Sequence, residues 1–312
     1  MLCRLFCHHT LTSFFIMTTH KAGFVNIVGN PNVGKSTLMN SLVGERISII
    51  TSKAQTTRHR IMGIVNTDDM QIVYSDTPGV LSPHYKLQES MLNFSQSALT
   101  DADILLYVTD VIETPDKNPD FLQRVTKETI PVILVINKID LLQDQSQLES
   151  LVESWKSRLP KAEIIPVSAQ HRFNLDYLMR RIQELLPPSP PFFEKDALTD
   201  KPARFFVTEI IREKILLTYD KEIPYACEVA VEQFKEDNKQ IHIMAVIYVE
   251  RDSQKGIIIG KGGKMLKQVG IAARKDIETF FEKKVFLELF VKVEKDWRNK
   301  ESKLKNFGYQ LD

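Results

Sequence analysis

Short apolar runs alternate with amphipathic stretches through the first 190 positions of the chain. The apolar runs have the length and composition of buried strands, and they lie at 24–28, 61–66, 70–76, 104–110, 131–137 and 163–167. Helical periodicity occurs at 36–43, 116–128, 146–158 and 175–186. Strands that alternate with helices predict a mostly parallel sheet with helices on both faces. We therefore expect an α/β domain over residues 21–188.

A proline-rich segment then interrupts the pattern. The sequence PPSPP occupies positions 187–191. Proline fixes φ and removes the backbone donor, so neither a helix nor a central strand can continue there. Segments of this kind act as stiff spacers between domains. We assign 189–202 to a linker and 203–312 to a second domain.

The second domain has a different order of elements. A helical pattern at 203–219 is followed by alternating strand patterns at 225–234 and 240–250. A glycine-rich loop at 256–263, a helix at 264–283, a strand at 285–293 and a basic amphipathic tail follow. The sequence therefore predicts a small α+β domain of the order α-β-β-loop-α-β.

Composition narrows the classes of protein that fit. The 312 residues are 43% apolar and 26% charged, which is typical of a globular protein with room for two domains. No apolar run reaches the roughly 18 residues that span a bilayer. The three cysteines form no disulfide framework, so we expect a cytoplasmic protein.

Charge is unevenly distributed, although the net charge is only +1. Residues 1–200 hold 19 Lys and Arg against 22 Asp and Glu, whereas residues 201–312 hold 22 against 18. The segment 255–284 alone holds 8 basic against 3 acidic residues. A basic second domain favours a polyanionic partner such as nucleic acid.

The first 20 residues fit neither domain. Cys3, Cys7, His8 and His9 are potential metal ligands, but their spacing matches no usual zinc site and no second half of a site follows. A signal peptide would need a longer apolar core. We interpret residues 1–20 as an N-terminal extension that is disordered or carries a misassigned start, in which case Met17 is the true start and residues 1–16 lie upstream of it.

The strongest chemical signal follows the first strand. The sequence GNPNVGKS at 29–36 is a P-loop, whose glycines let backbone N–H groups approach phosphate oxygens at a helix N-terminus. Lys35 supplies a charge to the β- and γ-phosphates, and the Ser36 hydroxyl can bind Mg²⁺. The predicted nucleotide-binding residues here are Gly29, Asn30, Pro31, Asn32, Val33, Gly34, Lys35, Ser36 and Thr37.

A second motif, Asp76-Thr77-Pro78-Gly79, ends the third strand and adds four nucleotide-binding residues. Asp76 can hold Mg²⁺, and the backbone N–H of Gly79 can contact the γ-phosphate, so triphosphate would order this loop. The polar loop at 51–58 is a second candidate switch, in which we prefer Thr57 to Thr56 as a magnesium ligand. The predicted catalytic residues are Lys35, Thr57, Asp76 and Gly79, and the predicted metal ligands are Ser36, Thr57 and Asp76.

Guanine selectivity is predicted from Asn137-Lys138-Ile139-Asp140, at the end of another strand. The Asp140 carboxylate can accept hydrogen bonds from guanine N1–H and the 2-amino group. Adenine offers neither donor, and its complex would leave Asp140 unpaired. Asn137 would brace the loop. Ser168 and Ala169 follow the last strand, where the Ala169 N–H would meet guanine O6.

Val80 lies at the position where regulatory GTPases of the Ras type carry a glutamine that orients water. Valine cannot orient water, although the residue still belongs to the expected nucleotide site. We therefore expect slow turnover. Asn32 either caps the P-loop or binds K⁺ near the β- and γ-phosphates, as in a group of GTPases with similar loops, and both interpretations stay open.

A glycine-rich loop in the second domain predicts contact with nucleic acid. The sequence GKGG at 260–263 matches the Gly-x-x-Gly clamp of KH domains, whose backbone passes close to about four nucleotides. Neighbouring lysines would neutralise phosphates. The alternative is a plain surface loop. The predicted RNA-binding residues are Ile259, Gly260, Lys261, Gly262, Gly263, Lys264 and Lys267.

These motifs together resemble those of the Era family of bacterial GTPases. The sequences KAQTTRHR at 53–60 and GIIIGKGG at 256–263 match that family, and the resemblance covers roughly residues 20–312. It implies a mostly parallel-sheet P-loop GTPase domain followed by a small α+β type II KH domain. It also implies GTP or GDP and Mg²⁺ as ligands, with 16S rRNA and the small ribosomal subunit as partners. A monomer with peripheral association at the inner face of the cell membrane is expected on the same basis.

Two other functions remain open at this point. A GTPase acting on tRNA or in translation would carry a different RNA-binding module, which the Gly-x-x-Gly loop after two strands argues against. A non-catalytic RNA-binding protein would have no need of Lys35, Ser36 and Asp76 together. The favoured hypothesis is a GTP-hydrolysing factor in 30S subunit biogenesis, although the N-terminal extension departs from the family pattern.

Overall fold

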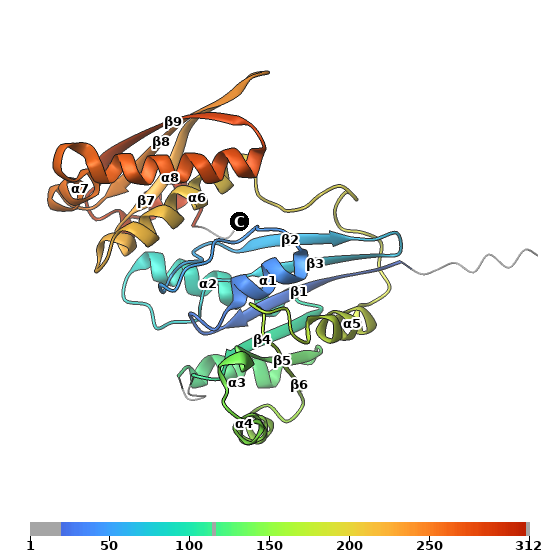
Figure 1. Ribbon diagram of the computed structural model, residues 1–312. Coiled ribbons are helices and arrows are strands. Elements are labelled where there is room, and N and C mark those ends of the chain that lie inside the picture. The colour runs from blue at the N-terminus through green and yellow to red at the C-terminus, as the bar shows by residue number, and fades with distance from the viewer. Residues whose placement is uncertain (1–19, 114–116, 310–312) are drawn as a thin grey trace, which may run out of the picture.

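Two lobes, each built on its own sheet, form the computed structural model, which describes residues 20–113 and 117–309 (Figure 1). The N-terminal extension predicted over residues 1–20 lies almost wholly outside the described residues. The first lobe holds a six-stranded sheet of order β2-β3-β1-β4-β5-β6. Its strands are β1 (Lys21–Gly29), β2 (Ile61–Asn66), β3 (Met70–Asp76), β4 (Ile104–Asp110), β5 (Val132–Asn137) and β6 (Glu163–Pro166). Its helices are α1 (Lys35–Val43), α2 (Lys86–Thr100), α3 (Pro119–Lys127), α4 (Gln145–Arg158) and α5 (Leu175–Leu185).

The sheet of the first lobe is mostly parallel, as the alternation of strands and helices predicts. β2 pairs antiparallel with β3, and the other neighbouring strands pair parallel. Strand β4 is buried along its whole length because helices cover both faces. Ile104 and Leu106 point toward the core that contains α1 and α5, whereas Leu105 and Tyr107 point toward the core that contains α2, α3 and α4.

The second lobe is an α+β unit in which a three-stranded sheet packs against helices. Strand β7 pairs antiparallel with β8, and β8 pairs parallel with β9. One apolar core joins the sheet to its helices. The elements are α6 (Ala203–Thr218), β7 (Glu228–Glu236), β8 (Gln240–Val249), α7 (Asp252–Ile259), α8 (Lys264–Phe281), β9 (Lys284–Val293) and α9 (Glu301–Asn306). Short 3₁₀ helices occupy Ile139–Leu141, Ile223–Tyr225, Lys261–Gly263 and Trp297–Asn299.

Two helices were not expected from the sequence. Helix α2 occupies a segment for which no element was predicted. Helix α7 contains Gly256 and the three isoleucines that precede the loop, so these residues are helical and the glycine loop begins only at Gly260. The observed order of the second lobe is therefore α-β-β-α-α-β, in place of the expected α-β-β-loop-α-β.

The predicted linker lies against the first lobe. The Ile64 N–H donates to the carbonyl oxygen of Leu198 at 2.8 Å, and Gly63 forms an isolated antiparallel bridge with Thr199. The buried side-chain amide of Gln71 accepts from the backbone N–H of Phe192 and Phe193 and donates to the carbonyl oxygen of Phe193. These contacts hold the segment beside β2 and β3.

The lobes also meet through a buried apolar cluster. Leu87, Met91 and Phe94 of α2 pack against Trp297 and Leu304 of the C-terminal segment, and Tyr309 belongs to the same cluster. In Figure 1, α6 and β7 lie on the side of the second lobe that faces the first. The C-terminal segment therefore joins the lobes as well as ending the chain.

Candidate functional site

The P-loop crosses the carboxyl end of β1 and leads into α1. A side chain at Gly29, which has φ +147°, would clash with the carbonyl oxygen of Val108, and one at Gly34 would clash with the Asn137 amide. Asn32 has φ 66°, in the left-handed region. The loop therefore needs glycine at two points so that its backbone can turn beneath a bound anion.

Lys35 is buried inside this loop. Its ammonium group donates to the carbonyl oxygens of Gly29, at 3.1 Å, and Asn30, at 2.8 Å. Burial lowers the pKa of Lys35 to about 8, although the carboxylates of Asp76 and Glu113 favour its charged form. Oxygens of a bound phosphate would replace the carbonyl oxygens of Gly29 and Asn30 as acceptors of the hydrogen bonds from the Lys35 ammonium group.

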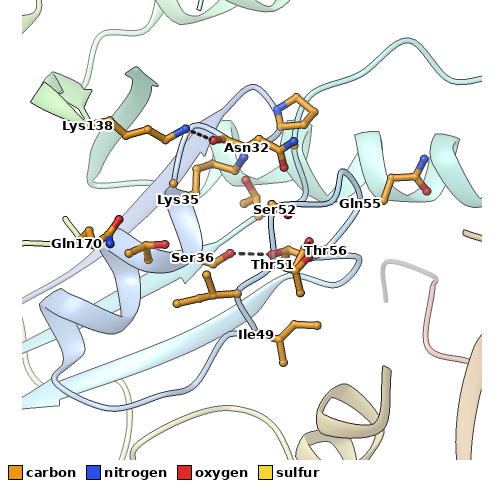
Figure 2. Close-up of a pocket in the computed structure, with 17 residues that line it drawn as sticks. Asn32, Lys35, Ser36, Ile49, Thr51, Ser52, Gln55, Thr56, Lys138 and Gln170 are labelled. Carbon is orange, nitrogen blue, oxygen red and sulfur yellow. Dashed lines mark hydrogen bonds between the residues drawn. The ribbon is translucent and has the colours of Figure 1, made fainter. Parts of the chain in front are cut away.

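A cavity of about 420 Å³ opens above the P-loop. Figure 2 shows Lys35 and Ser36 at this cavity together with Thr51, Ser52 and Thr56 of the candidate switch loop. Thr77, Gly79, Lys138 and Gln170 are among the other residues that line it. Residues from four of the predicted motifs therefore surround one space.

Three predicted metal ligands come together at the base of this cavity. The Ser36 hydroxyl lies 2.6 Å from Asp76 Oδ2 and 2.8 Å from Thr57 Oγ1, and Thr57 Oγ1 lies 3.3 Å from the same carboxylate oxygen. Thr56 instead contacts Thr51 and the carbonyl oxygen of Lys53. The geometry therefore groups Thr57, and not Thr56, with Ser36 and Asp76.

The Asp76 carboxylate fits a divalent cation. Asp76 is fully buried, and its Oδ1 has no hydrogen-bond partner among the described residues. Burial raises the pKa of Asp76 in spite of the Ser36 hydrogen bond and the Lys35 charge. A hard cation such as Mg²⁺ prefers carboxylate and hydroxyl oxygens, and it would stabilise this buried carboxylate.

Val80 and Gly79 occupy the place expected of a γ-phosphate loop. A side chain at Gly79 would lie 2.7 Å from Pro31 of the P-loop. The Val80 N–H donates to the carbonyl oxygen of Gly29 at 3.1 Å, and its side chain packs in the core beside α2 and α3. Val80 therefore directs no side chain toward the cavity, in agreement with the expectation that it orients no water.

The predicted guanine-binding residues are braced against the P-loop. Asn137 donates to the carbonyl oxygen of Val33 at 2.9 Å. Lys138 donates to the carbonyl oxygen of Asn32 and to the Asp110 carboxylate, each at 2.6 Å. Asp140 accepts from the Ser168 hydroxyl. Strands β5 and β6 end at the same edge of the parallel sheet, which brings these distant segments together.

One predicted contact differs in detail. The Ala169 N–H, which was expected to meet guanine O6, donates to Asn137 Oδ1 at 3.0 Å. A base at this site would have to share or replace that hydrogen bond. Asp110 was not anticipated at the site, although its place at the end of a strand could have indicated it. Gln170 belongs to the predicted Ser168-Ala169-Gln170 segment and lines the cavity.

The predicted RNA-binding loop lies between α7 and α8. Gly260, Gly262 and Gly263 have φ of 70°, 61° and 74°, which favour glycine, and a side chain at either of the last two would meet open space. The exposed side chains of Lys261, Lys264 and Lys267 surround the loop. Ile259, predicted as part of the glycine-rich loop at 256–263, is the last residue of α7.

A groove of about 340 Å³ adjoins this loop. Helix α8 and strand β9 line it with Leu266, Lys267, Ile271, Arg274 and Leu289, among others. Apolar walls with basic residues suit unstacked bases and their phosphates. Arg274 and Ile271 were not predicted, although Ile271 lies about two turns and Arg274 about three turns beyond the glycine loop on α8.

Clusters of His, Cys, Asp or Glu side chains that could hold a metal ion, and helices that could cross a membrane, are both absent from the part of the chain that the structure describes. Within residues 20–113 and 117–309, no group of three or more His, Cys, Asp or Glu side chains could hold a metal ion. Cys3, Cys7, His8 and His9 lie outside those residues. Over the same ranges, no helix is both long and apolar enough to cross a membrane.

Comparisons with known proteins match each of the two lobes to a protein family. The model of the family described as 50S ribosome-binding GTPase matches residues 24–138, and the KH domain model matches residues 222–298. The chain is similar to Era in complex with MgGDPNP and nucleotides 1506–1542 of 16S ribosomal RNA, with 39% identity, a TM-score of 0.89, and coverage of 94% of this chain and 100% of that one. It is also similar to a variant of Aquifex aeolicus Era bound to GDP and AlF4⁻, with 38% identity, a TM-score of 0.88, and coverage of 93% and 100%.

Proposed function

Because the chain belongs to the Era family of GTPases, we propose that it hydrolyses GTP as a switch protein and binds 16S rRNA through its KH domain during small-subunit assembly. The description of the matching GTPase family names the 50S subunit, whereas the similar Era structure contains a fragment of 16S rRNA. The similarity to that Era structure covers both lobes of the chain, whereas the match to the GTPase family covers only the first. We therefore favour the small ribosomal subunit over the 50S subunit.

One observation carries the proposal. Ser36, Thr57 and Asp76 lie within 3.3 Å of one another beneath the P-loop, and a buried carboxylate oxygen there has no partner among the described residues. These residues come from α1, a loop and β3, and nothing in a purely structural role requires them to meet. A magnesium–triphosphate site does.

The residues act on the triphosphate mainly through charge and position. Lys35 would move its hydrogen bonds from the loop carbonyls to the β- and γ-phosphates, and the Gly79 N–H would donate to the γ-phosphate. Ser36, Thr57 and Asp76 would hold Mg²⁺, which neutralises charge on the phosphate oxygens when bound. Val80 directs no polar group at the attacking water, so unassisted hydrolysis would be slow.

The segment Asn137–Asp140, together with Ser168, would select guanine. Asp140 would accept from N1–H and the 2-amino group, and Ser168 holds the carboxylate in place. Asn137 and Lys138 donate hydrogen bonds to carbonyl oxygens of the P-loop. The residues that would bind the base are therefore held in a fixed position relative to those that would bind the phosphates.

The glycine loop and its groove would bind single-stranded RNA. Lys261 and Lys264 would neutralise phosphates, the loop backbone would pass close to the RNA backbone, and the groove beside α8 would hold bases.

Three further expectations complete the proposal. Asn32 binds K⁺, which would supply positive charge near the β- and γ-phosphates of a site where Val80 orients no water. The protein is a cytoplasmic monomer, and it associates peripherally with the cell membrane. The P-loop asparagine together with Val80 motivates the first expectation, and family membership supports the other two, which fractionation of cells and the solution mass of the purified chain would test.

GTP turnover with and without RNA tests the function. We expect slow GTP hydrolysis that requires Mg²⁺, no comparable ATP hydrolysis, and tight binding of an RNA fragment from the 3′ end of 16S rRNA. Preference for tRNA over that fragment would favour a translation GTPase. RNA binding without any GTP hydrolysis would favour a non-catalytic RNA-binding protein.

A further inference from the structure

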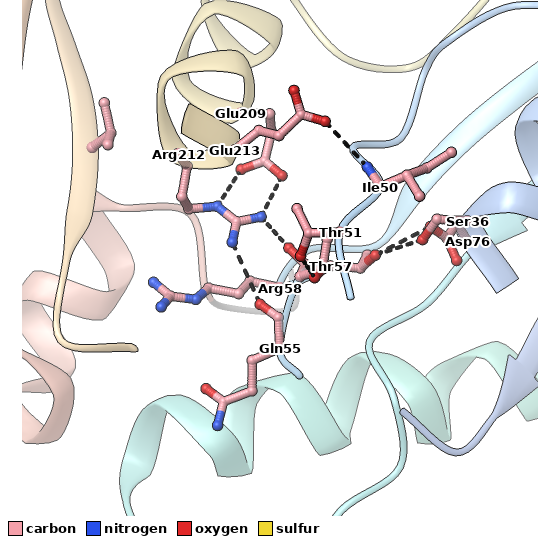
Figure 3. A network of polar contacts seen from close by, with 12 residues as sticks. Ser36, Ile50, Thr51, Gln55, Thr57, Arg58, Asp76, Glu209, Arg212 and Glu213 are labelled. Atoms are coloured by element: carbon pink, nitrogen blue, oxygen red, sulfur yellow. Dashed lines mark hydrogen bonds and ion pairs between the residues drawn. The ribbon is translucent and has the colours of Figure 1, made fainter. Parts of the chain in front are cut away.

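The segment that carries Thr57 is held by the second lobe rather than by the first. Thr57 faces Ser36 and Asp76 in the first lobe, while the next residue, Arg58, enters the second lobe (Figure 3). On the premise of the proposed GTPase function, we propose that Arg58 is a positioning residue for hydrolysis. Its capture by the second lobe fixes Thr57 at the magnesium site.

Arg58 is completely buried in a pocket made by the second lobe. Its Nη1 donates to the Cys227 carbonyl oxygen at 2.8 Å and to Glu228 Oε2 at 3.0 Å, and its Nη2 donates to the Pro224 carbonyl oxygen at 3.1 Å. The Tyr309 hydroxyl donates to the same Glu228 oxygen at 2.5 Å. Release of Arg58 would leave the buried Glu228 carboxylate without its ion pair, which is strongly unfavourable.

The residues before Thr57 are also fixed by the second lobe. Arg212 of α6 donates to the carbonyl oxygens of Gln55 and Thr56, and its guanidinium is itself held by two hydrogen bonds to Glu209 (Figure 3). Arg212 and Glu209 are both buried. Thr57 is therefore fixed from both sides by groups that belong to the second lobe.

Because Arg58 follows Thr57 directly in the chain, the burial of Arg58 in the second lobe limits where Thr57 can lie. Adjacent Cα atoms lie about 3.8 Å apart, so a fixed Arg58 leaves Thr57 little room to move. Misplacement of a reacting or coordinating group by about 1 Å can cost roughly 10²-fold in rate. Movement of the second lobe would thus displace a magnesium ligand without touching the nucleotide.

A nearby arginine is directed to the first lobe instead. Arg60 makes its contacts within the first lobe, with Ser75, Asp101 and Asn26. Two arginines two positions apart are therefore directed to different lobes. His59, between the two arginines, stacks on Tyr309 of the second lobe, so the chain changes its attachment between His59 and Arg60.

The test compares full-length variants with the parent in steady-state GTP hydrolysis at a series of Mg²⁺ concentrations. Arg58→Met and Glu228→Gln should each lower kcat by about 10²-fold and raise the Mg²⁺ concentration needed for half-maximal rate, with little change in KM. GDP affinity should stay at the parental value, because a switch threonine engages the metal only while γ-phosphate is present. The double variant should lose no more than Arg58→Met, because both changes remove one interaction.

A matched control removes another ion pair between the lobes. Glu301 of α9 lies 2.6 Å from Lys86 of α2, and both side chains are exposed. Exposed pairs contribute little, so Glu301→Gln should keep the parental kcat and Mg²⁺ dependence. Where Glu228→Gln fails to fold, Tyr309→Phe removes one hydrogen bond to Glu228 and keeps the ring stacked on His59, so it gives the same readout.

Two results would overturn the inference. Folded variants with parental kcat and parental Mg²⁺ dependence would show that Thr57 is positioned without Arg58. A parallel fall of thermal stability, GDP affinity and kcat would show a purely structural role. A parent chain that hydrolyses no GTP would refute the proposed function itself, which separates that failure from this one.

Discussion

The Ser168 hydroxyl donates a hydrogen bond to the Asp140 carboxylate across 28 positions of sequence. Ser168 is buried, whereas the Asp140 side chain is 27% exposed, so a buried hydroxyl holds the carboxylate while part of its surface stays accessible to a base. The contact explains why a weak Ser-Ala signal in the sequence belongs to the same site as the stronger Asn-Lys-Ile-Asp motif.

Asp140→Asn should weaken GTP binding by roughly 10- to 100-fold, the value of hydrogen bonds to a charged acceptor. The amide that replaces the carboxylate can donate to the 2-oxo group of xanthine, so xanthosine triphosphate should bind better than before. Titration with fluorescent nucleotides measures both effects. The exposed residue Asp196 provides the control, because Asp196→Asn makes the same change outside the site. Equal GTP affinity in the parent and Asp140→Asn would remove Asp140 from base recognition.

Potassium should stimulate hydrolysis if Asn32 binds it. A cation at this position would offset charge that develops on the phosphoryl group, and inserted arginines in other GTPases provide about 10³–10⁵ in rate by that route, which sets an upper bound. The measurement is GTP turnover in K⁺ against Na⁺ at matched ionic strength, with and without Asn32→Ala. Identical rates in the two salts would exclude the ion, and stimulation that survives Asn32→Ala would exclude this ligand.

Changing Lys261 and Gly262 to Asp together should abolish RNA binding and leave GTP binding intact. Gly262 has φ 61°, which aspartate tolerates better than most residues, so the loss would come from its charge and side chain and not from backbone strain. RNA titrations at several salt concentrations should show a steep salt dependence for the parent. Lys295→Asp makes a similar charge change outside the loop and should bind nearly as the parent does. An unchanged titration for the double variant would place the RNA elsewhere.

Cys227 should react with alkylating reagents only when the second lobe opens. The thiol is fully buried, and burial raises its pKa from about 9 to about 12. Because the folded-state pKa is raised, this group's contribution to stability is complete below pH 9 and is lost as the pH rises toward 12. In a variant with Cys3→Ser and Cys7→Ser, labelling near pH 8 should be at least roughly 10³-fold slower in the folded chain than in denaturant. Rapid native labelling would show that this part of the lobe opens readily.

The elements that the sequence predicts well are those whose local pattern agrees with their final environment. Strand β4 is apolar at nearly every position because helices cover both its faces, so its pattern and its burial coincide. The P-loop, the Asp76 loop and the Asp140 loop follow strands that end at one edge of a parallel sheet. Topology alone then brings these loops together.

The two missed helices lack the usual local signals. Helix α2 begins after Tyr85, which provides no side-chain cap, so no starting residue marks it, although Leu87, Met91 and Phe94 form an apolar stripe. Helix α7 contains a glycine and three β-branched isoleucines, which favour a loop or a strand. Burial of Ile258 and hydrogen bonds from the backbone N–H groups of Glu250 and Arg251 to Gln254 outweigh those preferences.

The attachment of the lobes could not be predicted from the sequence. Arg58 is a charged residue in a polar loop, for which exposure is the ordinary expectation. Its burial depends on Glu228 and Tyr309, which lie 170 and 251 positions later in the chain. Nothing in the sequence around these two residues indicates that they contact Arg58. Contacts of this kind depend on how two separately folded cores meet.

The placement of residues 189–202 has a practical consequence. Strand β2 is the outer strand of the large sheet, and an uncovered outer strand offers unpaired backbone groups to other molecules. The Leu198 carbonyl oxygen and the bridge at Thr199 occupy part of that edge. A truncated first lobe that ends at Pro188 would expose it and should aggregate, whereas one that ends after Lys201 should remain soluble. The linker at 189–202, although it separates two domains, therefore also shields the first from self-association.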